Sequence, residues 1–119
     1  MATVESKAIN KPDEVRSVGK GSMAVVNMQG GAVGLGTFEP GWQWSKDVKP
    51  IAGTESCQAA HFGYVLSGRM AGRHDDGTEF EVGPGDIIYL SPGHDAWIVG
   101  DEPCRLLDWG GAANYAKPA

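Results

Sequence analysis

The chain has 119 residues, enough for one domain with its own core, and ten basic against fifteen acidic side chains give a net charge of −5. This excess of acidic side chains argues against binding to nucleic acids and against binding to an anionic membrane, because both depend on clustered Lys and Arg. Apolar stretches such as Ile87–Leu90 are far shorter than the roughly 20 residues of a membrane-spanning helix. The first residues show no basic patch followed by an apolar run, so we expect no secretory signal and a cytoplasmic location.

The expected elements follow one another as short strands. Residues 1–20 are polar and are predicted to form a loosely packed arm before a single domain over residues 21–119. Asp75–Gly77 is a strong hairpin signal, because Asp and Gly tolerate the positive φ angles of tight turns. The expected strands, in chain order, are Met23–Met28, Ala32–Phe38, Ser56–Leu66, Arg69–His74, Thr78–Val82, Ile87–Leu90, Ala96–Val99 and Cys104–Trp109.

Glycine is the most unusual feature of the composition. Its 18 copies are spread along the chain and mixed with Pro, which fits many tight turns between short strands. No stretch carries the apolar spacing of a long helix. Strands roughly 8–12 residues apart, joined by Gly and Pro turns, predict an all-β antiparallel sandwich or barrel. The two cysteines, Cys57 and Cys104, are expected to be free thiols.

Two segments carry a family resemblance. His61–Met70 reads HFGYVLSGRM, and Gly83–His94 reads GPGDIIYLSPGH. The turns at Gly68 and at Gly85 match best, and the similarity extends over roughly residues 35–109. In these motifs the chain resembles a small single-domain cupin. The resemblance implies a double-stranded β-helix, or jelly-roll barrel, with its site inside the barrel.

The first cupin motif places two His and one Glu, the family's metal ligands, ahead of a Gly. Counting back from Gly68 puts His61 at the Glu position, Cys57 at the second His and Glu55 at the first. Their even separations would place all three side chains on one face of an extended strand. A carboxylate, a thiol and an imidazole are ligands of zinc and of late divalent metals.

The second cupin motif ends in a fourth ligand. A gap-free count puts Ala96 at that position, whereas a shorter turn would put His94 there. Zinc is the favoured metal because a thiolate prefers it, with iron, manganese or nickel as alternatives. The competing interpretation is an empty barrel in which Cys57 is a small buried hydrophobe and His61 a hydrogen-bonded core residue. The metal site that the resemblance implies consists of Glu55, Cys57, His61 and His94.

Aromatic residues are the candidates for a substrate pocket. Trp44, Tyr64 and Trp97 are expected near the substrate, with core or subunit packing as the alternative. His74 is expected at a solvated strand end, and Asp108 among turn and surface carboxylates. Four tryptophans in so short a chain, together with the tendency of small cupins to pair through their sheets, predict a homodimer.

The function that the resemblance implies is metal-assisted chemistry on a small organic molecule such as an organic acid or a sugar. A dioxygenase, an isomerase or a lyase would fit. The alternative is a metal-free module that binds or senses a ligand without turning it over. Because one fold supports many chemistries, the fold alone does not choose between them.

Overall fold

The computed structural model describes residues 2–109; the end of the expected domain, residues 110–119, lies outside the described part. In that part, strands dominate and the two helices have four residues each. The elements are β1 (Glu14–Ser17), β2 (Gly21–Met28), β3 (Gly31–Phe38), α1 (Trp44–Asp47), α2 (Lys49–Ala52), β4 (His61–Ser67), β5 (Arg69–His74), β6 (Glu79–Val82), β7 (Ile87–Leu90), β8 (His94–Val99) and β9 (Cys104–Asp108).

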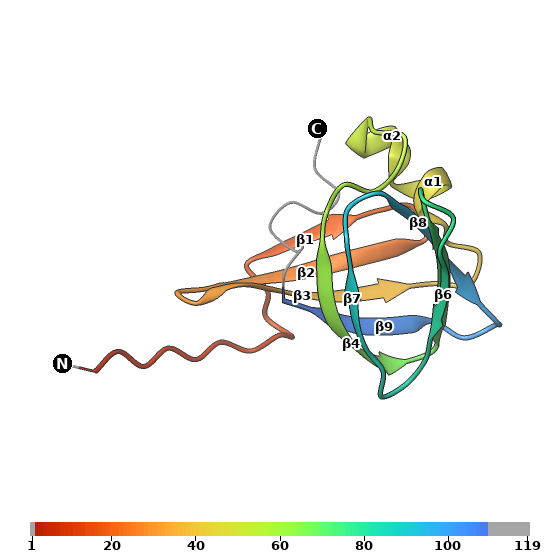
Figure 1. The fold of residues 1–119 in the computed structure, drawn as a ribbon. Coiled ribbons are helices and arrows are strands. Elements are labelled where there is room, and N and C mark those ends of the chain that lie inside the picture. Colours follow the sequence, from red (N-terminus) through yellow and green to blue (C-terminus); the bar gives the residue numbers. More distant parts are fainter. Residues whose placement is uncertain (1, 110–119) are drawn as a thin grey trace.

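The strands form two antiparallel sheets that face each other (Figure 1). The larger sheet has the order β1-β2-β3-β9-β4-β7, and the smaller one the order β6-β5-β8. Inward side chains of both sheets build one core, since successive residues of a strand point to opposite faces. In β8, for example, His94, Ala96 and Ile98 are buried and the residues between them are partly exposed. The all-β prediction is confirmed.

The N-terminal region differs from the expected loose arm. Glu14–Ser17 pairs with β2 as an edge strand, and Val18 is fully buried. Its sequence, Glu-Val-Arg-Ser, has one apolar residue in four, so it carries no strand pattern by itself. The strand forms because β2 offers it a ladder of backbone partners.

The two helices were also not expected. They are too short to show helical periodicity, and their ends are stabilised by contacts from elsewhere. The N–H of Ser45 donates to Asp95 of β8 at 3.0 Å, whereas the N–H of Gln43 donates at 2.9 Å to the carboxylate of Asp47 in the helix α1 itself. None of the helices in the described part of the chain has the length and hydropathy to span a bilayer.

The pairing of β4 in the larger sheet determines which residues meet inside the barrel. β4 lies between β9 and β7, so Gly63 pairs with Asp108 on one side and with Ile88 on the other. A Cβ atom at Gly63 would lie 2.3 Å from the carbonyl oxygen of Leu107, which only glycine avoids. This close approach brings the start of β4 beside the end of β9.

Candidate metal centre

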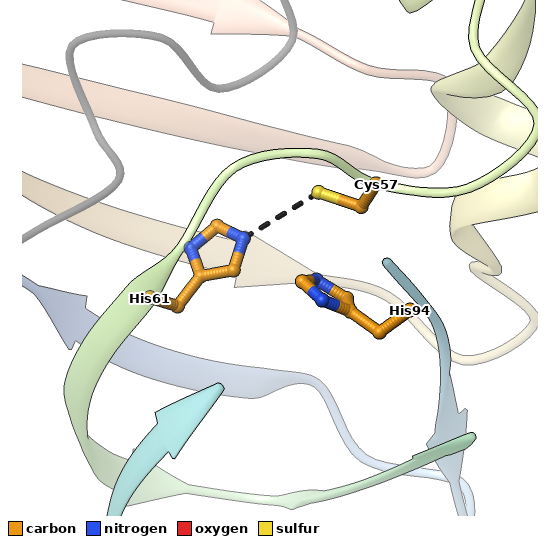
Figure 2. Close-up of side chains that lie close together, drawn as sticks. All are labelled: Cys57, His61 and His94. Atoms are coloured by element: carbon orange, nitrogen blue, oxygen red, sulfur yellow. Dashed lines mark hydrogen bonds between the residues drawn. The ribbon is translucent and has the colours of Figure 1, made fainter. Parts of the chain in front are cut away.

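Three side chains with metal-binding atoms converge inside the barrel: Cys57, His61 and His94. Cys57 lies in the loop before β4, and the two histidines are the first residues of β4 and β8. The N–H of Cys57 donates to the carbonyl of His94 at 2.8 Å, an isolated bridge that holds the loop against β8. The ligand atoms of the three residues all lie within 4.8 Å of one another. Figure 2 shows the three side chains pointing toward a common centre.

His61 is oriented by a buried carboxylate. Its Nδ1 lies 2.5 Å from Oδ2 of Asp108, whose residue is fully buried. A carboxylate accepts, so Nδ1 carries the proton and Nε2 faces the cavity, 3.6 Å from the sulfur of Cys57 (Figure 2). The other Asp108 oxygen accepts the N–H of Phe62 at 3.4 Å. A carboxylate behind a ligating histidine is the usual device that fixes its ring.

His94 is oriented in the same sense by a backbone oxygen. Its Nδ1 donates to the carbonyl of Ser91 at 2.8 Å, so Nε2 is the ring nitrogen that remains for Cys57 or a metal. The rings of His61 and His94 meet edge to face, with centroids 5.2 Å apart. Both histidines therefore turn Nε2, the nitrogen that can bind a metal once it has no proton, toward the cluster.

The cluster has a strong electrostatic coupling. Burial alone would raise the pKa of the Cys57 thiol, but hydrogen bonds from His61 and His94 outweigh it and lower that pKa to about 6. Burial alone would lower the pKa of His61, but hydrogen bonds to Asp108 and Cys57 raise it to about 9. At neutral pH the metal-free pair is a thiolate beside an imidazolium. For the other cysteine, Cys104, burial, together with the charge of Glu102, raises the pKa of the thiol to about 11.

The donor set fits a divalent transition metal. One thiolate and two imidazoles are zinc ligands, and three protein ligands leave a fourth tetrahedral position for water or substrate. Ala96 also faces the cavity but has no donor atom, whereas the ring of His94 lies in the cluster with Cys57 and His61.

Glu55 lies outside this group. Its carboxylate is 96% exposed and forms an ion pair with Lys49 at 2.9 Å. The reason is local: the hydroxyl of Thr54 donates to the carbonyl of Ser56 at 2.7 Å, and residues 54–56 form a bend after α2 instead of an extended strand. The strand begins only at His61, so the rule that residues an even number apart share one face does not apply to Glu55.

The cavity beside the cluster has a volume of about 60 Å³. Trp44 lies in its wall, as does Trp42, and both are buried, so neither is available to a second subunit. Tyr64 and Trp97 do not line the cavity. Gly63 faces inward in β4 and Ala96 in β8, so the alternation of the strands turns their neighbours outward.

Asp108 is the site residue that the sequence analysis placed at the surface. It is fully buried and lines the cavity together with Leu106, two residues earlier in β9. The signal in the sequence is the apolar Leu106 two residues before Asp108, because residues two apart in a strand lie on the same face.

The comparisons with known proteins agree with this architecture. Residues 52–110 match the family model of the cupin domain. A protein of unknown function from Rhizobium leguminosarum shares 20% identity, with 92% of this chain and 99% of that chain covered and a TM-score of 0.65. The comparison with curated proteins found no match.

Two solved structures of enzymes share the fold as well. The polyketide cyclase RemF from Streptomyces resistomycificus is 17% identical, with 92% of this chain and 80% of that chain covered and a TM-score of 0.63. A variant of oxalate decarboxylase from Bacillus subtilis is 21% identical over 90% of this chain and 29% of its own, with a TM-score of 0.60. With the two-sheet barrel, the family motif and these shared folds, the chain belongs to the cupin family.

Proposed function

We propose that the protein is a metal-dependent enzyme of small-molecule chemistry, with the metal held by Cys57, His61 and His94. The observation that carries this proposal is the convergence of three donor atoms within 4.8 Å in a buried cavity. The two imidazoles are fixed from behind by Asp108 and by the carbonyl of Ser91, which is how proteins prepare metal ligands.

The metal supplies Lewis-acid chemistry toward whatever occupies its open position. Zinc is the favoured ion, since the set contains a thiolate, and iron, manganese or nickel are alternatives. The chain's own residues hold the metal, keep both imidazoles in one tautomer and exclude bulk water through an apolar wall. Two structures with this fold are enzymes, which supports a catalytic role for this chain. Their names give no substrate for this chain, because one fold supports many chemistries.

The test is the metal content of protein purified without chelator and then offered zinc, iron, manganese, nickel and copper in turn. We expect close to one equivalent of a divalent metal and a higher melting temperature on loading. Cobalt is the spectroscopic probe, because a thiolate ligand adds a charge-transfer band. Cys57→Ala should lose this band, and the matched variant Cys104→Ala should keep it.

The second candidate is a metal-free module that binds a ligand in the barrel. The thiolate–imidazolium pair supports it, since this pair satisfies the polar atoms of the cavity without an ion. Metal below about 0.1 equivalent after all five additions, with a melting curve indifferent to zinc, would favour this module.

We also propose that the chain forms a homodimer. The outer face of β4 and β7 supports this, because it presents large apolar side chains to solvent. They are Phe62, Leu66, Ile87 and Tyr89, and the exposed Trp109, which follows β9, lies beside Phe62 with ring centroids 6.2 Å apart. Light scattering should return twice the mass of the chain at micromolar concentration, and Leu66→Asp should halve it. The mass of one chain in the unmodified protein would contradict this proposal.

A further inference from the structure

The inner cavity is small, and its polar groups are confined to one cluster of side chains. Its volume of about 60 Å³ is a fraction of the roughly 300 Å³ at which pockets for drug-sized ligands begin. Apart from the cluster of Cys57, His61, His94 and Asp108, the described residues that line it are apolar or aromatic. The indole N–H of Trp42 donates to the carbonyl of Val18 at 3.2 Å, so it is not free for a ligand.

A second, larger hollow lies outside this cavity. It has a volume of about 460 Å³ and is bordered by polar side chains of the β5–β6 hairpin and of the turn after β7 and by outward side chains of β7; besides the four described below, they are His74, Asp76, Thr78, Ser91, Ile87 and Tyr89. β6 and β7 are edge strands of different sheets and are not hydrogen-bonded to each other (Figure 1). The outer hollow therefore lies along the seam between the two sheets.

Four apolar side chains separate the two spaces. Phe80 and Val82 of β6 and Ile88 and Leu90 of β7 line both the inner cavity and the outer hollow. All four are partly buried. Because side chains alone close the seam at this point, it can open by rotamer changes without breaking backbone hydrogen bonds.

We propose that this seam is the entrance to the metal centre and that its four apolar side chains select small neutral substrates. The part about substrates rests on the proposed function. The substrate is a molecule of few non-hydrogen atoms with one metal-binding donor and no second charged group. A charge would lose its hydration at the seam and find no cation or hydroxyl in the cavity beyond the cluster. Sugars and dicarboxylates are therefore excluded, whereas small thiols and other small neutral ligands fit.

The route can be tested without metal, through the access of reagents to Cys57. Full-length protein with Cys104→Ala is treated with a neutral methyl thiosulfonate, a sulfonate-bearing analogue and a trimethylammonium-bearing analogue. In each case the thiolate sulfur attacks the sulfenyl sulfur, a disulfide forms and a sulfinate leaves. Rates are divided by those of the same protein unfolded in urea, which removes the intrinsic difference between reagents. We expect both charged reagents to be slower than the neutral one by about 100-fold.

The variants locate the entrance. Leu90→Ala or, if that variant does not fold, Phe80→Leu should speed both charged reagents by about tenfold, because a smaller side chain leaves a gap in the seam. Thr78→Ala borders only the outer hollow and should change the rates by less than about twofold. Equal rates for neutral and charged reagents, no reaction with the neutral one, or equal effects of Leu90→Ala and Thr78→Ala would each overturn the route.

The substrate class is tested on cobalt-loaded protein with two thiols that share a donor atom. Methanethiol should change the cobalt spectrum, and mercaptoacetate, which adds a carboxylate, should bind about 100-fold more weakly. Equal binding of the two would overturn the selectivity. A failure of the proposed function looks different: cobalt then produces no thiolate band, while the reagent rates still report on the seam.

Discussion

Two histidines of this chain have the same kinds of neighbour but lie in different places. Inside the barrel, His61 lies between the thiol of Cys57 at 3.6 Å and the carboxylate of Asp108 at 2.5 Å. On the surface, His74 lies between the hydroxyl of Ser91 at 3.0 Å and the carboxylate of Asp76 at 3.4 Å. By residue type, each set could be taken for a site in which a histidine activates a nucleophile.

Burial and proton placement separate the two sets. The Asp76 side chain is 67% exposed, whereas that of Asp108 is 1% exposed. The Nδ1 of His74 accepts the N–H of Asp76 at 3.3 Å, so its Nε2 carries the proton and donates to the carbonyl of Pro92 at 2.9 Å. Both ring nitrogens of His74 therefore hold the turn together. His61 instead turns Nε2 toward the cavity and Cys57, and this difference supports the proposal of a metal site inside the barrel.

The largest effect should come from removing each imidazole in turn. We expect His61→Ala to weaken zinc binding by more than about 100-fold, since even partners behind the ligands are worth about 10–100-fold. His74→Ala should bind zinc as the unmodified protein does. Competition with a chromophoric chelator measures both affinities. Equal losses in the two variants would remove the distinction between the inner and the surface set.

The carboxylates should differ in the same direction but by less. Asp108→Asn should weaken zinc binding by about 10–100-fold, because the ring of His61 loses the partner that orients it. The pKa of His61 should also fall, since the hydrogen bond that His61 donates to Asp108 is the main effect that raises it. Titration of the His61 ring protons by NMR separates this positioning role from a loss of folding.

Asp76→Asn is the matched control for the surface set, and it should leave zinc affinity unchanged. An unaltered His61 titration in Asp108→Asn would mean that this carboxylate packs in the core without acting on the imidazole.

The contrast also shows what the sequence could predict. The sheet and most strands follow from period-two patterns and Gly turns, and motif spacing identified Cys57, His61 and His94 as candidates. Glu55 shows where this reasoning stops, because the bend after Thr54 interrupts the strand period on which the count depended. Asp108 shows a second limit: the spacing from Leu106 indicates the face on which it lies, but its contact with His61 results from the register between β4 and β9, which the local sequence does not specify.

Acidity should change metal binding at the inner site over a wide pH range. The pKa of His61 is raised to about 9 and that of Cys57 is lowered to about 6. Between these pH values the metal-free pair therefore carries one proton that metal binding must remove, the second ring proton of His61. Metal must displace it, so affinity should rise about tenfold per pH unit from pH 6 to 9 and be lost more steeply below 6, where Cys57 is also protonated. Calorimetry in buffers of different ionisation enthalpy should count one proton released at pH 7.5. A count of zero would contradict the protonated His61.

The smallest effect concerns a link between the two sets. Ser91 joins them: its hydroxyl contacts His74, and its carbonyl accepts the proton of His94. His74→Ala removes a partly exposed hydrogen bond to Pro92, so the free energy of unfolding without metal should fall by about 1 kcal/mol in urea titration. Zinc affinity should nevertheless hold, because the backbone pairing of His94 with Cys57 fixes β8 independently of the turn. His74→Gln, which keeps a donor for Pro92, should recover part of the stability. A tenfold loss of zinc affinity in His74→Ala would instead mean that the surface turn controls the position of His94.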